Sequence, residues 1–464
     1  MNFRPIYHFS PPQNFMNDPN GLVYVNGEYH LFYQHNPFGV TWGHLCWGHA
    51  TSKDYLHWSH QPIALYEENG IRIFSGSAVV DENNTTGFRQ NGTRNQPAPI
   101  VAVYTGDSLH LQTQNLAFSL DNGHTWTKYS GNPILDIGSD DFRDPKIFWH
   151  PPTQAWVMVV VLAKQHKISI FTSPDLQNWT FKTNFGPGGL IEGNWECPDL
   201  FELPIQAETG HAWVLKIDSG TGWYFIGDFD GSTFTEMQPP ERIDYGPDFY
   251  ACQTWSHLPP SQHSLIGYMA NWHYANFLPT TPWRGMMTIP RQISLRRFPA
   301  GLRLVQQPIE TLNLRRQEYQ VKGPLNGEKT LPVNGTALEI LAQFEMSSAS
   351  EFGLRVRVGI GESTVIGCTP ASRQLFIDRR KAGDASFYPS FADVFKAPLT
   401  IENGCVSLHI LVDSCSVEVF STEGSSVIGC LIFPDEKSQG ISVFASGGSV
   451  NLINLQIWKL DNQK

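Results

Sequence analysis

Short stretches in which apolar and polar side chains alternate run through most of this 464-residue sequence, whereas helical periodicity is almost absent. Alternation with a period of two is the pattern of a β-strand that buries one face. It is clearest at residues 27–34, 155–161 and 167–172. The chain also contains 40 Gly, 32 Pro and 12% aromatic residues, a mixture typical of many short strands joined by tight turns. We therefore predict an all-β protein.

A turn motif recurs along the first half of the chain. In each copy an Asp-containing turn is followed by an aromatic residue that begins the next strand, at Trp58, Trp126, Trp179 and Phe234. Successive copies are 68, 53 and 55 residues apart. Repeats of roughly 50–60 residues built from short strands are typical of β-propeller blades, and about 300 residues at this spacing form five blades. Unrelated β-turns with aromatic neighbours are the alternative interpretation.

The pattern changes near residue 300. Residues 306–324 are typical of a connector, and alternating strands separated by turn signals then continue to the end of the chain. The clearest of these later strands are 337–344, 354–358, 406–413 and 416–420. We predict a five-bladed propeller at 1–305, a linker at 306–324 and a C-terminal β-sandwich at 325–464.

Five polar residues on turns or strand starts follow the same spacing as the blades: Asp18, Ser75, Asp144, Glu196 and Asp248. The intervals between them are 57, 69, 52 and 52 residues. Equivalent positions of successive blades converge on the axis of a propeller, so these side chains are expected to surround one pocket. Taken alone, Asp-Pro-Asn-Gly and Arg-Asp-Pro are more typical of structural turns, and the prediction depends on the joint spacing of the motifs.

Converging carboxyl groups are what the hydrolysis of a glycosidic bond requires. One carboxylate attacks the anomeric carbon, a carboxylic acid protonates the leaving oxygen, and further negative charge stabilises the oxocarbenium-like transition state. Glu196 lies between Trp195 and Cys197, an apolar setting that favours the protonated form of an acid. Arg143 precedes Asp144 and favours an ionised carboxylate that does not react.

Aromatic residues are concentrated in the same segments. They are Phe15, Trp42, Trp47, Phe74, Trp195, Trp272 and Trp283. Sugars present apolar C–H faces that pack on aromatic rings, so an acidic pocket lined by aromatic residues suits a carbohydrate. Packing between propeller blades is an equally good explanation for any one of these rings.

Together these motifs resemble glycoside hydrolase family 32, the family of invertases, exo-inulinases and levanases. The resemblance covers nearly the whole chain, including the predicted sandwich. The matching segments are Asn-Asp-Pro-Asn-Gly (17–21), Gln34, Trp42-Gly43, Trp-Gly-His (47–49), Phe-Ser-Gly-Ser (74–77), Phe-Arg-Asp-Pro (142–145), Trp-Glu-Cys-Pro (195–198), Asp-Phe-Tyr (248–250) and Trp283-Arg284. One difference is Phe15, where the family often has Trp before Met-Asn-Asp-Pro.

The resemblance implies the fold predicted above and a role for each acidic residue. Asp18 is expected to be the nucleophile, Asp144 to stabilise the transition state, and Glu196 to be the acid/base. The residues expected to bind the substrate are Asn17, Gln34, Trp42, Phe74, Ser75, Arg143, Cys197, Asp248 and Trp283.

We therefore predict a retaining, exo-acting β-fructosidase that hydrolyses terminal fructosyl units of sucrose, inulin or levan through a covalent fructosyl-enzyme. It is expected to need no metal or other cofactor. One enzymatic alternative is a fructosyltransferase, and another is a related five-bladed enzyme that acts on arabinose polymers with inversion of the anomeric configuration. A carbohydrate-binding protein that has lost catalysis is a third alternative, but all three carboxyl residues are present.

The net charge of −11 argues against nucleic acid or an anionic membrane as a partner and suits a neutral substrate. The seven Cys residues are widely scattered and odd in number, which favours free thiols over a disulfide framework. The longest apolar run, 156–163, is too short to span a bilayer, and no secretory signal is visible. We expect a cytoplasmic enzyme, or a secreted one whose signal has been removed.

Overall fold

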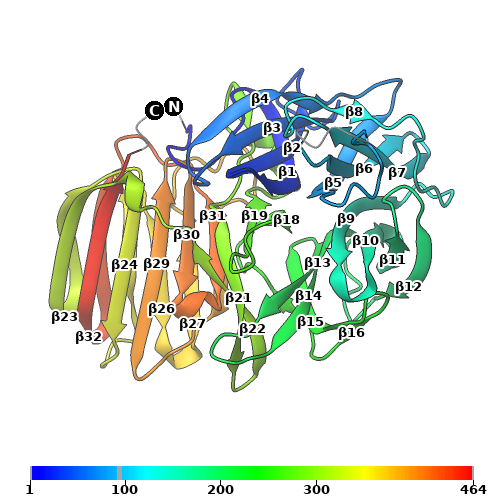
Figure 1. Cartoon of the computed structure of the whole chain (residues 1–464). Helices are drawn as coiled ribbons and strands as arrows, with labels where there is room; N and C mark the ends of the chain where they lie inside the picture. The colour runs from blue at the N-terminus through cyan, green and yellow to red at the C-terminus, as the bar shows by residue number, and fades with distance from the viewer. Residues whose placement is uncertain (1–2, 91–96, 462–464) are drawn as a thin grey trace.

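The computed structural model describes residues 3–90 and 97–461. Five small antiparallel sheets and one ten-stranded sheet account for the strands, which confirms the predicted all-β fold of a propeller followed by a sandwich. Figure 1 shows the propeller beside the sandwich, with the fifth blade next to it. Short 3-10 turns lie at Pro151–Thr153, Ala163–Gln165, Ala275–Phe277, Leu312–Leu314, Pro370–Ser372 and Thr422–Gly424. Within the described residues, no helix is long and apolar enough to cross a membrane.

The first two blades are built from consecutive strands, with the first strand of each nearest the axis. The first contains β1 (Asn14–Val25), β2 (Glu28–Asn36), β3 (Cys46–Ser52) and β4 (Trp58–Leu65). The second contains β5 (Arg72–Val80), β6 (Ile100–Ser108), β7 (Leu111–Ser119) and β8 (Thr127–Lys128). The short strand β20 (Trp283–Arg284) pairs in parallel with the start of β1 and so joins the end of the propeller to its beginning.

The remaining three blades repeat this order. The third contains β9 (Phe142–His150), β10 (Ala155–Leu162), β11 (Lys167–Ser173) and β12 (Thr180–Phe185). The fourth contains β13 (Trp195–Pro204), β14 (His211–Ser219), β15 (Gly222–Phe229), β16 (Phe234–Glu236) and β17 (Glu241–Arg242). The fifth contains β18 (Tyr250–Thr254), β19 (Ser264–Tyr268), β21 (Arg291–Phe298) and β22 (Gly301–Pro308).

The repeated Asp turn joins the third and fourth strands of the first four blades. In each copy the Asp carboxylate accepts hydrogen bonds from backbone N–H groups of the turn, as Asp175 does from Gln177 and Asn178. In the first three copies the Trp indole N–H also bonds a backbone carbonyl three residues earlier, as from Trp179 to Leu176. These contacts explain why the turn reappears once per blade.

The C-terminal sheet has ten strands. They are β23 (Arg315–Asn334), β24 (Leu338–Glu345), β25 (Glu351–Val358), β26 (Thr364–Thr369), β27 (Gln374–Asp378), β28 (Val394–Pro398), β29 (Cys405–Asp413), β30 (Ser416–Ser421), β31 (Val427–Leu431) and β32 (Gly440–Leu460). The long strands β23 and β32 pair with each other through several register shifts, which let one sheet fold into two layers. The alternating side chains of these layers enclose a separate apolar core.

The connector expected at 306–324 consists mostly of strand in the structure, because β22 continues to Pro308 and β23 begins at Arg315. The side chains of β23 are mainly exposed, so its sequence lacks the apolar alternation of a buried strand. Its stability comes from backbone pairing with β32.

A buried polar network joins the two domains. His8, in the N-terminal segment, contacts Asp413 at 2.8 Å and Glu418 at 2.9 Å, both in the sandwich. Arg291 of the fifth blade donates to the second Glu418 oxygen at 2.7 Å and to Asp244 at 2.9 Å. Two apolar clusters also contain residues of both domains, so propeller and sandwich share part of their core.

Candidate active site

All five inner strands have an irregular register close to their first residues. The irregular steps fall at 16–19, 73–76, 143–146, 196–199 and 250–253. A bulge bends a strand and turns side chains out of the regular alternation. Because the inner strands surround the propeller axis, these bulges direct side chains into the space at one end of it.

Three of the bulges use a backbone conformation that is uncommon outside Gly. Asp144, Cys197 and Ala251 have φ values of 63°, 47° and 51°, at equivalent points of the third, fourth and fifth blades. Contacts between blades hold this conformation. The Asp144 N–H donates to the Thr105 hydroxyl at 2.9 Å, and the Cys197 N–H donates to the Asp144 carboxylate at 2.9 Å.

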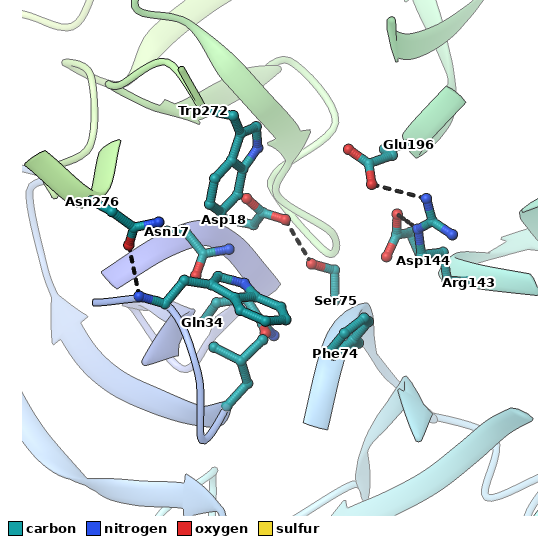
Figure 2. A pocket seen from close by; sticks show the side chains of 12 residues that line it. Asn17, Asp18, Gln34, Phe74, Ser75, Arg143, Asp144, Glu196, Trp272 and Asn276 are labelled. Atoms are coloured by element: carbon teal, nitrogen blue, oxygen red, sulfur yellow. Dashed lines mark hydrogen bonds and ion pairs between the residues drawn. The ribbon is translucent and has the colours of Figure 1, made fainter. Parts of the chain in front are cut away.

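A cavity of about 410 Å³ opens at this end of the axis (Figure 2). Its lining contains nine of the residues singled out in the sequence: Asn17, Asp18, Gln34, Trp42, Phe74, Ser75, Arg143, Asp144 and Glu196. Leu45, Trp272 and Asn276 complete it. Figure 2 shows Asp18 and Glu196 on opposite sides of this space, with Asp144 and Arg143 beside Glu196.

Asp18 and Asp144 are held by donors from neighbouring blades. The Ser75 hydroxyl donates to Asp18 Oδ2 at 2.9 Å. The Cys197 thiol lies 3.6 Å from the same Asp18 oxygen and 3.7 Å from Asp144 Oδ2. Asp18 Oδ1 and Asn17 Oδ1 are buried and accept no hydrogen bond within the described structure. These two oxygens therefore have unused hydrogen-bonding capacity beside the cavity.

Glu196 is fixed through both of its oxygens. Arg143 Nη2 donates to Oε1 at 2.9 Å, and the Tyr250 hydroxyl donates to Oε2. Arg143 itself is oriented by Asp141, which accepts from Nη1 at 2.8 Å. These hydrogen bonds position Glu196. Because 28% of its side chain is exposed, Glu196 also remains open to a ligand.

Burial changes the acidity of this cluster. It is the largest cause that raises the pKa of Asp18 to about 6; Glu196 adds to the shift, and hydrogen bonds from Asn17 and Ser75 oppose it. Burial likewise raises the pKa of Asp144 to about 7, against the opposing charge of Arg143. Ionising both groups in this cavity is therefore unfavourable, and near neutral pH they are close to the point at which they release protons.

A buried contact joins the inner strands of three blades. The Lys146 ammonium donates to Asp199 at 3.0 Å and to the Thr254 carbonyl at 2.8 Å. Lys146 and Asp199 stand at the ends of the irregular steps of β9 and β13, and Thr254 is the last residue of β18. None of the three residues lines the cavity.

Three predicted binding residues lie elsewhere. Cys197 is buried behind the carboxylates and bonds to them, as described above, without lining the cavity. Asp248 is fully buried and is not a lining residue, because Arg379 of the sandwich and Tyr274 take up its oxygens. Trp283 is also buried and absent from the lining: its ring packs against Arg4 at 4.7 Å. Asp248 and Trp283, expected at the substrate, are thus not among the residues that line this cavity.

Two lining residues were not singled out by sequence reasoning, and one was noted only as an aromatic residue. Leu45 and Asn276 carry no recognisable motif, and Trp272 was one of several clustered rings. Trp272 and Asn276 belong to a segment between β19 and β20 that folds over the cavity (Figure 2). Within the described residues, no group of three or more His, Cys, Asp or Glu side chains is arranged to hold a metal ion.

Known protein families and relatives match this chain over nearly its full length. Residues 8–308 match the N-terminal domain of glycosyl hydrolases family 32, and residues 309–459 match the C-terminal domain of that family. A levanase of Bacillus subtilis (strain 168) is 44% identical over 482 residues, which cover 99% of this chain and 70% of the levanase. An extracellular exo-inulinase of Aspergillus awamori is 38% identical over 512 residues, covering 99% of this chain and 94% of that protein.

Solved structures also share the fold of this chain over nearly its full length. The crystal structure of exo-inulinase from Aspergillus awamori has a TM-score of 0.94 and 37% identity, covering 100% of this chain and 99% of that one. A β-fructofuranosidase from Schwanniomyces occidentalis, solved with fructosyl-erythritol, has a TM-score of 0.91 and 32% identity, covering 99% of this chain and 98% of that one. With both domains matched and the acidic motifs gathered in one cavity, the chain belongs to glycosyl hydrolases family 32.

Proposed function

We propose that this protein is a retaining, exo-acting β-fructosidase in which Asp18 is the nucleophile, Glu196 the acid/base and Asp144 the stabiliser of the transition state. The observation that carries the proposal is the meeting of these three carboxyl groups, from three different blades, in one cavity. The comparisons place the chain among enzymes that act on fructosides.

In the first step the Asp18 carboxylate attacks the anomeric carbon of the terminal fructosyl unit while Glu196 donates its proton to the leaving oxygen. The bond to the leaving sugar breaks and a fructosyl ester of Asp18 forms. In the second step Glu196 takes a proton from water, the water oxygen attacks the same carbon, and the ester bond to Asp18 breaks. One water is consumed, and Asp18 and Glu196 return to their starting states.

Asp144 is suited to a third role. It is held by the Cys197 N–H and lies 3.9 Å from Arg143 Nε, so its position does not depend on the substrate. Above its pKa of about 7 Asp144 is mainly ionised. A negative charge held close to the developing oxocarbenium ion stabilises the transition state more than the ground state.

Exo action is supported by the relative named exo-inulinase, which is 38% identical to this chain. A chain end would place its terminal fructosyl unit beside Asp18, Asp144 and Glu196, and the rest of the chain would extend outwards past Trp42 and Trp272. Fructose is therefore released one unit at a time.

We propose fructans of the levan and inulin types as substrates, together with sucrose, because all of them present a terminal β-fructosyl group. Relatives with 44% and 38% identity are named levanase and exo-inulinase, which supports the two polymers. A polymeric substrate also favours action outside the cell, in agreement with the name of the extracellular exo-inulinase.

The test is a time course of products from levan, inulin and sucrose. We expect free fructose from the earliest samples, and NMR before mutarotation should show the β-anomer that a retaining mechanism releases. Early fructobiose or longer oligomers from the polymers would contradict exo action, and an initial α-anomer would contradict retention. Growth of longer products at high sucrose would identify a transferase instead.

The proposed roles are tested by Asp18→Asn and Glu196→Gln, which keep side-chain shape and remove the reacting carboxyl group. Each should lower kcat by about 10³-fold or more, and Asp144→Asn should also be severely impaired. Glu202→Gln is the matched control, because Glu202 is exposed at the far end of the same strand β13. Near-normal activity of Asp18→Asn or Glu196→Gln would show that the assigned role is wrong.

A further inference from the structure

One wall of the cavity is formed by residues 271–278, called here the wall segment, between β19 and β20. It contributes Trp272 and Asn276 to the lining (Figure 2). The Asn276 side-chain carbonyl accepts the Trp42 backbone N–H at 2.8 Å. The wall segment is thus joined to the first blade across the mouth of the cavity.

The wall segment is anchored on its other side by the sandwich domain. Tyr274 is buried, and its hydroxyl donates to Asp248. Arg379, which directly follows β27 of the sandwich, donates to the second Asp248 oxygen at 2.6 Å and to the Tyr274 hydroxyl at 3.1 Å. Leu431 of β31 adds a backbone N–H to the same Asp248 oxygen at 2.8 Å.

Apolar contacts strengthen this anchor. The Tyr274 ring lies 5.3 Å from Phe391 and 5.6 Å from Tyr388, both in a loop of the sandwich. The Arg379 guanidinium lies over the Phe391 ring at 3.7 Å, with 1% of the Arg379 side chain exposed. Arg379 donates through Nε to the Phe391 carbonyl at 2.6 Å, so the guanidinium is held on several sides.

The wall segment borders the place of the leaving group. The Trp272 ring approaches Tyr250 edge-on at 6.4 Å, and the Tyr250 hydroxyl bonds Glu196, the proposed acid. The acid protonates the leaving oxygen, so the group beyond that oxygen lies on the side of Glu196. A sugar there would contact the exposed faces of Trp42 and Trp272.

We infer that Arg379 and Tyr274 are positioning residues through which the sandwich domain holds the wall segment against the leaving group of the substrate. The inference rests on the proposed function and extends it: the C-terminal domain takes part in the choice of substrate as well as in stability. It predicts a dependence on leaving-group size that a purely structural contact would not produce.

The test compares Tyr274→Phe with the wild-type enzyme on substrates that differ only beyond the scissile bond. For sucrose and inulin we expect KM to rise about tenfold with kcat nearly unchanged, since the lost anchor weakens binding of the leaving group. For methyl β-fructofuranoside, whose methyl group is too small to reach the wall segment, KM should stay within about twofold of the wild type.

Tyr7→Phe is the matched control. Tyr7 is also buried between the domains, and its hydroxyl donates to the Val412 carbonyl at 2.9 Å, away from the wall segment. This variant removes a tyrosine hydroxyl that, like that of Tyr274, bonds to the other domain, and it should leave every KM unchanged. An equal rise of KM in both variants would show a general loosening of the interface and overturn the inference.

A second variant removes the ion pair. Arg379→Met alone would leave Asp248 as an unpaired buried charge, so it is combined with Asp248→Asn. We expect the same selective rise of KM for sucrose and inulin. Unchanged KM values in both this double variant and Tyr274→Phe would refute the inference. Absence of wild-type activity on every fructoside would instead refute the proposed function, so the two failures are distinguishable.

Discussion

At the scale of single residues, the cavity gathers buried carboxyl groups whose ionisation lowers the stability of the folded protein. Asp18 has a pKa of about 6 in the folded protein, against an ordinary value of 3.8, chiefly because burial disfavours its charged form. The folded state therefore binds this proton more tightly than the unfolded state does. Stability contributed by Asp18 is fully present below about pH 4 and is lost as the pH rises through about 6.

Asp18→Asn should consequently stabilise the protein at pH 8 while abolishing activity. We expect a gain on the order of 1–3 kcal/mol in the free energy of unfolding at pH 8 and almost none at pH 4. The amide preserves an acceptor for the Ser75 hydroxyl, so packing should not change. Urea unfolding at both pH values measures the difference. A gain of equal size at pH 4 would show that the charge is not its cause.

At the scale of elements, the first four blades share the short Asp turn between their third and fourth strands. The Asp175 carboxylate accepts hydrogen bonds from the Ser173 hydroxyl, two backbone N–H groups and the Asn178 amide. Partial burial raises the pKa of Asp175, but these hydrogen bonds outweigh it and the pKa lies below its ordinary value. The turn is therefore stabilising above about pH 4 and weakens as the pH falls further.

Asp175→Ala should destabilise the third blade by about 1–2 kcal/mol at pH 7, because the donors of the turn lose their acceptor. The effect should shrink towards pH 2–3, where the wild-type carboxylate is protonated. Thermal unfolding followed by circular dichroism measures both. Asp228→Ala, at an exposed position on β15, is the control and should change stability by less than about 0.5 kcal/mol. A loss no larger than that of the control would contradict this role.

At the scale of the whole molecule, buried charges join the two domains. His8 lies between Asp413 and Glu418, and although burial opposes its protonation, these carboxylates raise its pKa to about 9. The unfolded chain has the ordinary value of 6.5. Protonated His8 therefore contributes stability that is fully present below pH 6.5 and is lost as the pH rises through about 9.

His8→Gln should lower the free energy of unfolding by on the order of 2 kcal/mol at pH 6 and by much less at pH 10. Chemical unfolding monitored by tryptophan fluorescence at the two pH values is the measurement. Both domains should unfold in one transition, because their cores share two apolar clusters. The same loss at both pH values would show that packing, and not the charge of His8, is responsible.

Much of this organisation was predictable from the amino-acid order. Alternation identifies strands because side chains of a strand point to opposite faces, and it does so without any distant contact. The Asp turns before Trp58, Trp126 and Trp179 repeat because their hydrogen bonds are local. The blade spacing then brings Asp18, Asp144 and Glu196 to one axis, since equivalent positions of a propeller must converge.

Tertiary structure decided which of the aligned positions face the cavity. Asp248 follows the same spacing, yet Arg379, 131 residues away in another domain, pairs with its carboxylate and keeps it from the lining. Trp272 and Asn276 reach the cavity because the wall segment is held over it, by that anchor and by Arg284, which donates to the Asn276 and Leu278 carbonyls. Spacing along the chain places a residue in a blade, but the competition between partners for a buried charge depends on contacts that form only when both domains have folded.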